Sequence, residues 1–112
     1  AVNYGDDNYH KIKEIKVDGS GSIRTKFDIK ANADSNAVKG RIYKNGVAIG
    51  TEQTTASATY STKSEDFSNI VPGDLIQLYA SDSSQSGYIA YVRNFRLYLD
   101  ETPSLKKRVI TD

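Results

Sequence analysis

Cysteine, tryptophan and methionine are absent from this chain of 112 residues, which has one histidine and two prolines. Without cysteine there is no disulfide, no thiolate nucleophile and no cysteine-ligated zinc. The lack of disulfides leaves the redox compartment open, because an exported protein need not contain them. The length predicts one domain with a single two-layer core.

Long apolar runs and an excess of one charge sign are also missing. No apolar run approaches the roughly 20 residues that span a membrane, so we expect no membrane partner. Fifteen basic and fourteen acidic residues give a formal net charge of +1. This balance creates no broad field that would attract nucleic acid or an anionic membrane.

Serine, threonine, asparagine and glycine are abundant, and they favour an all-β protein with many turns. Eight tyrosines against three phenylalanines predict a core with a polar border. The clearest predicted strand covers residues 22–31, where apolar and polar side chains alternate strictly. Such alternation is typical of an antiparallel strand with one face on a core and the other in water. The inward row is Ile23, Thr25, Phe27, Ile29 and Ala31, and the outward row is Arg24, Lys26, Asp28 and Lys30. Because the outward row mixes charge signs, we interpret it as a solubilising surface and not as a binding stripe.

The segment "RIYKNGVAIG" (41–50) predicts a β-hairpin. Asn45-Gly46 is the preferred pair for a two-residue type I′ turn, in which both central residues need positive φ. The register then places Tyr43 opposite Ala48. The residues expected on one face are Val38, Gly40, Ile42, Val47 and Ile49.

Further strands are predicted at 11–17, 54–67, 74–80 and 88–99. In the last of these the apolar parity shifts near Val92–Asn94, and a β-bulge there would place its apolar residues on one side. The pattern predicts an antiparallel β-sandwich of seven to eight short strands, for which a jelly roll is one arrangement. We expect the domain at 11–99, an N-terminal arm at 1–10 and a C-terminal arm at 100–112.

Catalytic constellations are hard to find in this sequence. His10 would have to serve any Ser-His-Asp triad, yet it lies in the predicted arm without a G-x-S-x-G context. The acidic residues fall mostly in turns, arms and outward strand positions, and none are singled out as a glycosidase pair. "GDDN" (5–8) and "DSSQSG" (82–87) offer oxygens that calcium prefers, but not in EF-hand spacing. We therefore predict no enzyme, no cofactor and no metal-ligating residues, with a loop-bound calcium left open.

Nucleic acid and carbohydrate are the two ligand classes that the aromatic residues suggest. "YVRNFRLY" (91–98) combines basic and aromatic side chains, but Phe95 shares its parity with core residues, so we predict no nucleic-acid partner. Sugar-binding modules are often β-sandwiches that present aromatic rings, although tyrosine is also a common strand residue. The candidate ligand or partner surface consists of Tyr43, Asn45, Tyr88, Asn94 and Tyr98.

Two segments, 41–55 and 66–98, resemble β-sandwich domains in structural proteins of tailed bacteriophages and related viruses. The shared features are a Tyr-Lys-Asn-Gly-Val hairpin, a Pro-Gly-Asp turn before an apolar strand, and a final strand of the Val-Arg-Asn-Phe type. The resemblance implies a tail-fibre, baseplate or capsid-decoration module, located in a virion or outside the cell. It brings no catalytic residue.

The resemblance also implies partners, namely other virion proteins or identical subunits in a homo-oligomer. Terminal segments of such proteins commonly pair with adjacent subunits, and "RVIT" (108–111) is long enough to add a strand to a sheet edge. The candidate assembly residues are Arg108, Val109 and Ile110. The alternative function is a carbohydrate-binding module that attaches to a receptor or substrate glycan.

Overall fold

The computed structural model describes residues 9–32, 37–82, 90–101 and 107–111, which form nine β-strands and no helix. The described residues therefore hold no helix able to cross a membrane. The strands are β1 (His10–Lys16), β2 (Gly21–Ala31), β3 (Val38–Lys44), β4 (Val47–Ala48), β5 (Gln53–Thr55), β6 (Ser61–Ile70), β7 (Leu75–Ser81), β8 (Ala90–Glu101) and β9 (Lys107–Thr111).

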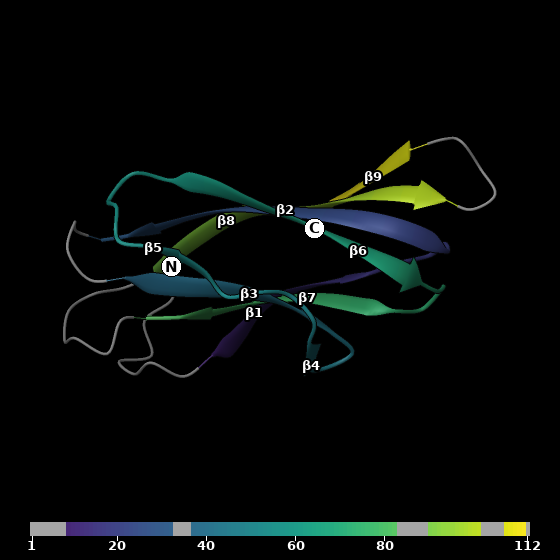
Figure 1. Ribbon diagram of the computed structural model, residues 1–112, viewed down its shortest axis with the longest axis horizontal. Helices are drawn as coiled ribbons and strands as arrows, with labels where there is room; N and C mark the ends of the chain where they lie inside the picture. The colour runs from purple at the N-terminus through teal and green to yellow at the C-terminus, as the bar shows by residue number, and fades with distance from the viewer. Residues whose placement is uncertain (1–8, 33–36, 83–89, 102–106, 112) are drawn as a thin grey trace.

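The strands form two antiparallel sheets that pack face to face (Figure 1). Sheet A has the order β1-β7-β3-β4, and β5 also pairs with β3. Sheet B has the order β6-β2-β8-β9. The predicted all-β antiparallel sandwich is confirmed. Because β1, β2 and β3 alternate between the sheets, both layers depend on contacts between residues far apart in the sequence.

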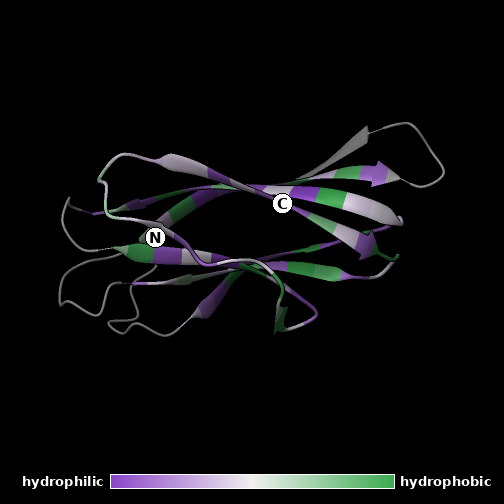
Figure 2. Cartoon of the chain, in the orientation of Figure 1, coloured by the Kyte–Doolittle hydropathy of each residue, from purple (hydrophilic) through white to green (hydrophobic). Residues whose placement is uncertain are grey.

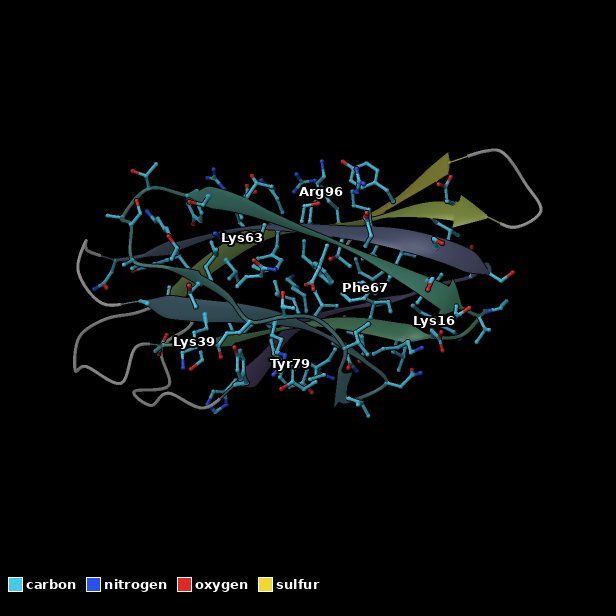
Figure 3. The ribbon with its side chains drawn as sticks, viewed as in Figure 1. Lys16, Lys39, Lys63, Phe67, Tyr79 and Arg96 are labelled. Atoms are coloured by element: carbon cyan, nitrogen blue, oxygen red, sulfur yellow. The ribbon has the colours of Figure 1, made fainter. Side chains whose placement is uncertain are left out.

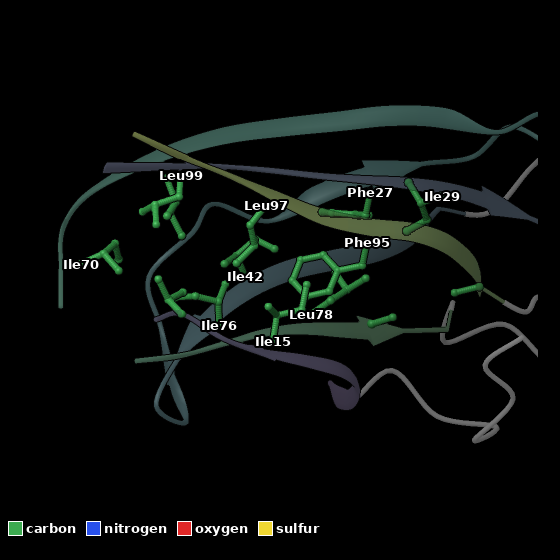
Figure 4. Packing of buried hydrophobic residues seen from close by; sticks show 14 of the residues in the cluster. Ile15, Phe27, Ile29, Ile42, Ile70, Ile76, Leu78, Phe95, Leu97 and Leu99 are labelled. Atoms are coloured by element: carbon green, nitrogen blue, oxygen red, sulfur yellow. The ribbon is translucent and has the colours of Figure 1, made fainter. Parts of the chain in front are cut away.

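The core lies between the two sheets, where apolar side chains from both inner faces meet (Figure 4). Figure 2 shows hydrophobic and hydrophilic residues alternating along strands of both sheets. The predicted inward row of β2 is confirmed, since Phe27 and Ile29 are at most 1% exposed. Full burial of such a side chain stabilises the fold by about 1.5–3 kcal/mol. The layers approach closely at Gly40, where a Cβ atom would lie 2.7 Å from Cε2 of Phe27. Glycine therefore allows the central strands β2 and β3 to pack together.

The hairpin between β3 and β4 has the predicted register. Tyr43 pairs with Ala48, and Asn45 and Gly46 have φ angles of 51° and 84°. The amides of Ile49 and Gly50 both donate to the carbonyl of Ile42, at 3.1 and 3.0 Å, so a bulge follows the hairpin. The expectation that Val47 lies with the core residues is wrong, because this side chain, paired with Lys44 next to the turn, is 65% exposed.

The predicted bulge in β8 is also confirmed. The pairing of β2 with β8 shifts between Lys26 and Asp28, and Asn94 has a φ of 56°. As a result the apolar side chains on both sides of the bulge turn toward the core. These are Ala90, Phe95, Leu97 and Leu99, which are buried, and Val92, which is partly buried.

The edge strand β6 carries charged side chains on its inner face. The predicted strand at 54–67 is divided into β5 and β6, with a connection at 56–60. Lys63 and Glu65 are only partly exposed, and they share parity with Phe67, which lies between the layers in Figure 3. Glu65 Oε2 accepts hydrogen bonds from the Thr51 amide and hydroxyl, at 2.9 and 3.1 Å. Inward-pointing charge is a known protection of sheet edges against further strand pairing.

Candidate ligand-binding surfaces

The outer face of sheet B gathers charged and aromatic side chains from β6, β2 and β8, and we call it the sheet B face. Its two central rows lie side by side because β2 and β8 pair along most of their length. Facing pairs are Arg24 with Tyr98, Lys26 with Arg96, Asp28 with Arg93 and Lys30 with Tyr91. Figure 3 shows Arg96 pointing away from the core at this face.

Asp28 is the centre of this surface. It is 7% exposed, and it accepts hydrogen bonds from Thr62 Oγ1 at 2.8 Å, Asn94 Nδ2 at 3.0 Å and Arg93 Nε at 3.3 Å. Arg96 Nη1 lies 3.9 Å away. Burial alone would raise the pKa of Asp28, but these hydrogen bonds and the charge of Arg96 hold it below its usual range. The ionised carboxylate thus orients two arginines on the outer surface.

Tyrosine rings on the sheet B face lie next to cations. The Arg93 guanidinium carbon is 3.7 Å from the Tyr60 ring centroid. The Lys30 ammonium lies between two rings, 4.9 Å from the centroid of Tyr60 and 5.3 Å from that of Tyr91. Such cation–π contacts hold both partners in place at an exposed site.

A cleft of about 500 Å³ opens on the same face. Lys26 contributes to its lining, and its ammonium lies 5.4 Å from the centroid of Tyr98, which also lines the cleft. Arg24 and Asp66 form a two-pronged ion pair there, with N–O distances of 2.7 and 3.0 Å. Asp100 and two serines complete the polar lining. The cleft therefore offers cations, carboxylates, hydroxyl groups and an aromatic ring together.

The outer face of sheet A has a different arrangement, in which tyrosines contact one another. The rings of Tyr43 and Tyr79 are stacked, with centroids 3.8 Å apart and planes at 16°. Tyr9 lies against Tyr43 at 6.4 Å and donates its hydroxyl to Glu52 Oε2 at 2.8 Å. Burial and this carboxylate raise the pKa of Tyr9 well above its usual value. These contacts cover ring surface that a ligand would need.

The sequence-predicted candidate residues do not form one surface. Tyr43 lies on the sheet A face and Tyr98 on the sheet B face, at opposite sides of the sandwich. Asn94 lies in the β8 bulge, where it binds Asp28. Tyr88 lies outside the described residues.

Asn45 has a structural position in the hairpin turn. Its Nδ2 donates to Asp74 Oδ1 at 3.0 Å, and its Oδ1 accepts from the Leu75 amide at 2.9 Å. The second oxygen of Asp74 accepts from the Val71 amide at 3.0 Å. That bond, together with Asn45 and the charge of Lys44, lowers the pKa of Asp74 although desolvation opposes the shift. The network joins the hairpin to the Pro-Gly-Asp turn.

The candidate assembly segment lies within sheet B as β9. Arg108, Val109 and Ile110 pair with Leu99, Tyr98 and Leu97 of β8. The segment therefore adds a strand to the edge of its own sheet. The predicted N-terminal arm lies largely outside the described residues, and His10 begins β1.

Histidine and acidic side chains do not gather into a metal-binding cluster in the part of the chain that the structure describes. Within residues 9–32, 37–82 and 90–100, no three histidine or acidic side chains are close enough to hold a metal ion. The loop segments considered for calcium lie outside the described residues except for Asp82, whose Oδ1 accepts from the Ala90 amide at 2.8 Å.

The sequence reasoning did not identify the central residues of the sheet B face, which are Asp28, Lys30, Tyr60 and Tyr91. The sequence does contain a pattern that points to these residues, because Asp28 and Lys30 belong to the outward row of 22–31 and Tyr91 belongs to "YVRNFRLY". What was missing was the pairing of these two strands, which places the rows next to each other.

Comparisons with family models, with curated proteins and with solved structures find no match to this chain.

Proposed function

We propose that the chain is a non-enzymatic structural or accessory module of a virion that binds identical subunits or a protein lattice through its sheet edges and terminal segments. The virion setting rests on the resemblance of 41–55 and 66–98 to phage β-sandwich domains. A capsid-decoration or tail-fibre role agrees with a fold composed of two antiparallel sheets.

The observation that supports this proposal most is the position of β9. This strand pairs along its length with β8 and makes no comparable contact with another described element. A strand that pairs with one edge of a sheet can pair in the same way with β8 of a neighbouring copy. Exchange of β9 between subunits would link them without new side-chain chemistry.

The other edge of sheet B is less suited to strand addition. β6 carries Lys63 and Glu65 on its inner face, and an added strand would have to accommodate these charges. Assembly through sheet B is therefore expected at the β8–β9 side.

The proposal is tested by the solution mass of the full chain and of a variant truncated after Glu101. The full chain is expected to form a dimer or larger assembly, measured by sedimentation equilibrium across a concentration series. The truncated chain, which lacks β9, is expected to be monomeric while keeping a β-rich circular dichroism spectrum. A full chain that stays monomeric at all concentrations, or a truncated chain that assembles equally well, would contradict the proposal.

Attachment to a carbohydrate is a second candidate function, and the sheet B face is the observation that favours it. Tyr60, Tyr91 and Tyr98 are partly exposed there beside cations and hydrogen-bonding groups. This combination is used by proteins to recognise hydroxyl-rich ligands with aromatic and polar contacts.

A further inference from the structure

We infer that the sheet B face binds an acidic carbohydrate chain, one whose sugars carry carboxylate or sulfate groups. This inference rests on the second candidate function, glycan attachment, and it specifies the surface and the charge of the ligand. The surface extends from the cleft beside Lys26 to the tyrosines around Lys30.

The charge of the sheet B face favours an anionic ligand. The basic side chains of this face, Arg24, Lys26, Lys30, Arg93 and Arg96, outnumber the acidic ones, Asp28, Asp66 and Asp100. Asp28 is already neutralised by Arg93 and Arg96. Among the described residues, neither Lys26 nor Lys30 has a carboxylate within ion-pair distance. Their charges are therefore available to an anion from solution.

Each of these lysines lies beside an aromatic ring. Lys26 lies by Tyr98, and Lys30 lies between Tyr60 and Tyr91. A ring next to a cation suits a sugar with an acidic group, because the ring packs against its C–H groups while the ammonium binds the acid. The cation–π contacts of Lys26 and Lys30 already restrict these side chains. Less conformational entropy is therefore lost when a ligand binds.

The spacing of the two lysines indicates a chain and not a single sugar. Lys26 and Lys30 are four residues apart on the same face of β2, which corresponds to about 13 Å along a strand. The cleft at the first position measures about 500 Å³, within the usual range for small-ligand sites. A polymer with regularly placed acidic groups would reach both positions.

Single-stranded nucleic acid fits the same surface less well. It needs ring faces on which successive bases stack, together with a continuous basic groove. Asp66 and Asp100 line the cleft and would repel the charged groups of either ligand. A sugar chain has hydroxyl groups that can donate hydrogen bonds to these carboxylates, and a phosphodiester backbone of DNA has none.

The experiment is isothermal titration of the full chain with defined polymers. The probes are polygalacturonate, heparin, neutral dextran and a single-stranded oligothymidylate. The variant is the double substitution Lys26→Gln with Lys30→Gln. The matched control is Lys39→Gln with Lys16→Gln, which removes the same charge from sheet A. Circular dichroism verifies that both variants are folded.

We expect binding to polygalacturonate or heparin, which distinguishes carboxylate from sulfate ligands. The Lys26/Lys30 variant is expected to bind at least tenfold more weakly, and the control to bind within twofold of the parent. Equal losses in both variants would overturn the inference, because they would reflect net charge alone. Stronger binding to the oligothymidylate would overturn it in favour of nucleic acid.

The experiment distinguishes failure of this inference from failure of glycan attachment, the function on which it rests. Binding to dextran that is insensitive to the lysine substitutions would retain glycan attachment but overturn the acidic ligand and its site. No binding to any polysaccharide would overturn both.

Discussion

Asparagine is the residue on which the local geometry of this protein depends. Asn45, Asn69 and Asn94 have φ angles of 51°, 61° and 56°, and no other non-glycine residue among those described has positive φ. Asparagine tolerates this region better than most residues do. Only Asn45 was recognisable from its neighbours, because a glycine follows it. The other two lie where the pairing of β6 and of β8 with β2 is irregular.

Replacing Asn45 by alanine should lower the free energy of unfolding by about 1–3 kcal/mol. The variant loses the hydrogen bonds to Asp74 and Leu75 and places an alanine at positive φ. Urea denaturation measures the effect. Val47→Ala is the control, since this side chain is 65% exposed and its truncation should change stability by no more than about 0.5 kcal/mol. Equal stability of the two variants would contradict this role of Asn45.

At the scale of the element, β8 shows how one extra residue maintains an apolar face. On the β2 side, Phe27 is the one residue between Lys26 and Asp28, whereas Asn94 and Phe95 lie between their partners on β8. This extra residue allows Val92 and Phe95, three positions apart, to point in the same direction. The bulge also brings Asn94 to Asp28, so it contributes to the sheet B face.

Deleting Asn94 should leave a folded protein, because regular alternation from Val92 through Arg93 to Phe95 would then be restored. Deleting Arg96 should prevent folding, since Leu97 and Leu99, both fully buried, would turn outward. Thermal unfolding followed by circular dichroism distinguishes the two. A cooperative transition in the Arg96 deletion, or none in the Asn94 deletion, would show that β8 does not obey this parity.

At the scale of the whole molecule, two buried carboxylates connect separate parts of the sandwich. Asp28 joins β2 to β6 and β8, and Asp74 joins the turn before β7 to the β3–β4 hairpin. Hydrogen bonds and nearby cations hold the pKa of each below its usual range. Both groups therefore favour the folded state in their ionised form.

The stability of the protein should consequently fall as the pH is lowered. A depressed folded-state pKa contributes stability above the unfolded value, which is about 3.9 for aspartate. That contribution is lost as pH falls from about 4 through the folded pKa. Urea midpoints measured from pH 7 to pH 2.5 should show this loss. It should be smaller in the double variant Asp28→Asn with Asp74→Asn, and a loss as steep as that of the parent would contradict the assignment.

Much of the local structure could be predicted from the chain alone. Alternation in 22–31, the Asn45-Gly46 pair and the parity shift near Asn94 each report backbone geometry within a few residues, and all three predictions are confirmed. The candidate site could not be predicted in the same way. Its residues come from positions 22 to 100. The order of the strands in the sheet decides which outward-facing rows become neighbours.

The sequence by itself determined that the chain is an all-β sandwich, where the turn between β3 and β4 lies and which side chains of residues 22–31 face the core. These features follow from a period of two residues and from φ preferences. Only the tertiary structure decided that β2 lies between β6 and β8 and that Asp28 organises a surface of tyrosines and cations. It also placed the C-terminal segment on the edge of β8. These features arise from pairing between strands far apart in the sequence. The main-chain hydrogen bonds of such pairing are the same for every candidate partner strand, so the sequence of one strand does not specify its partner.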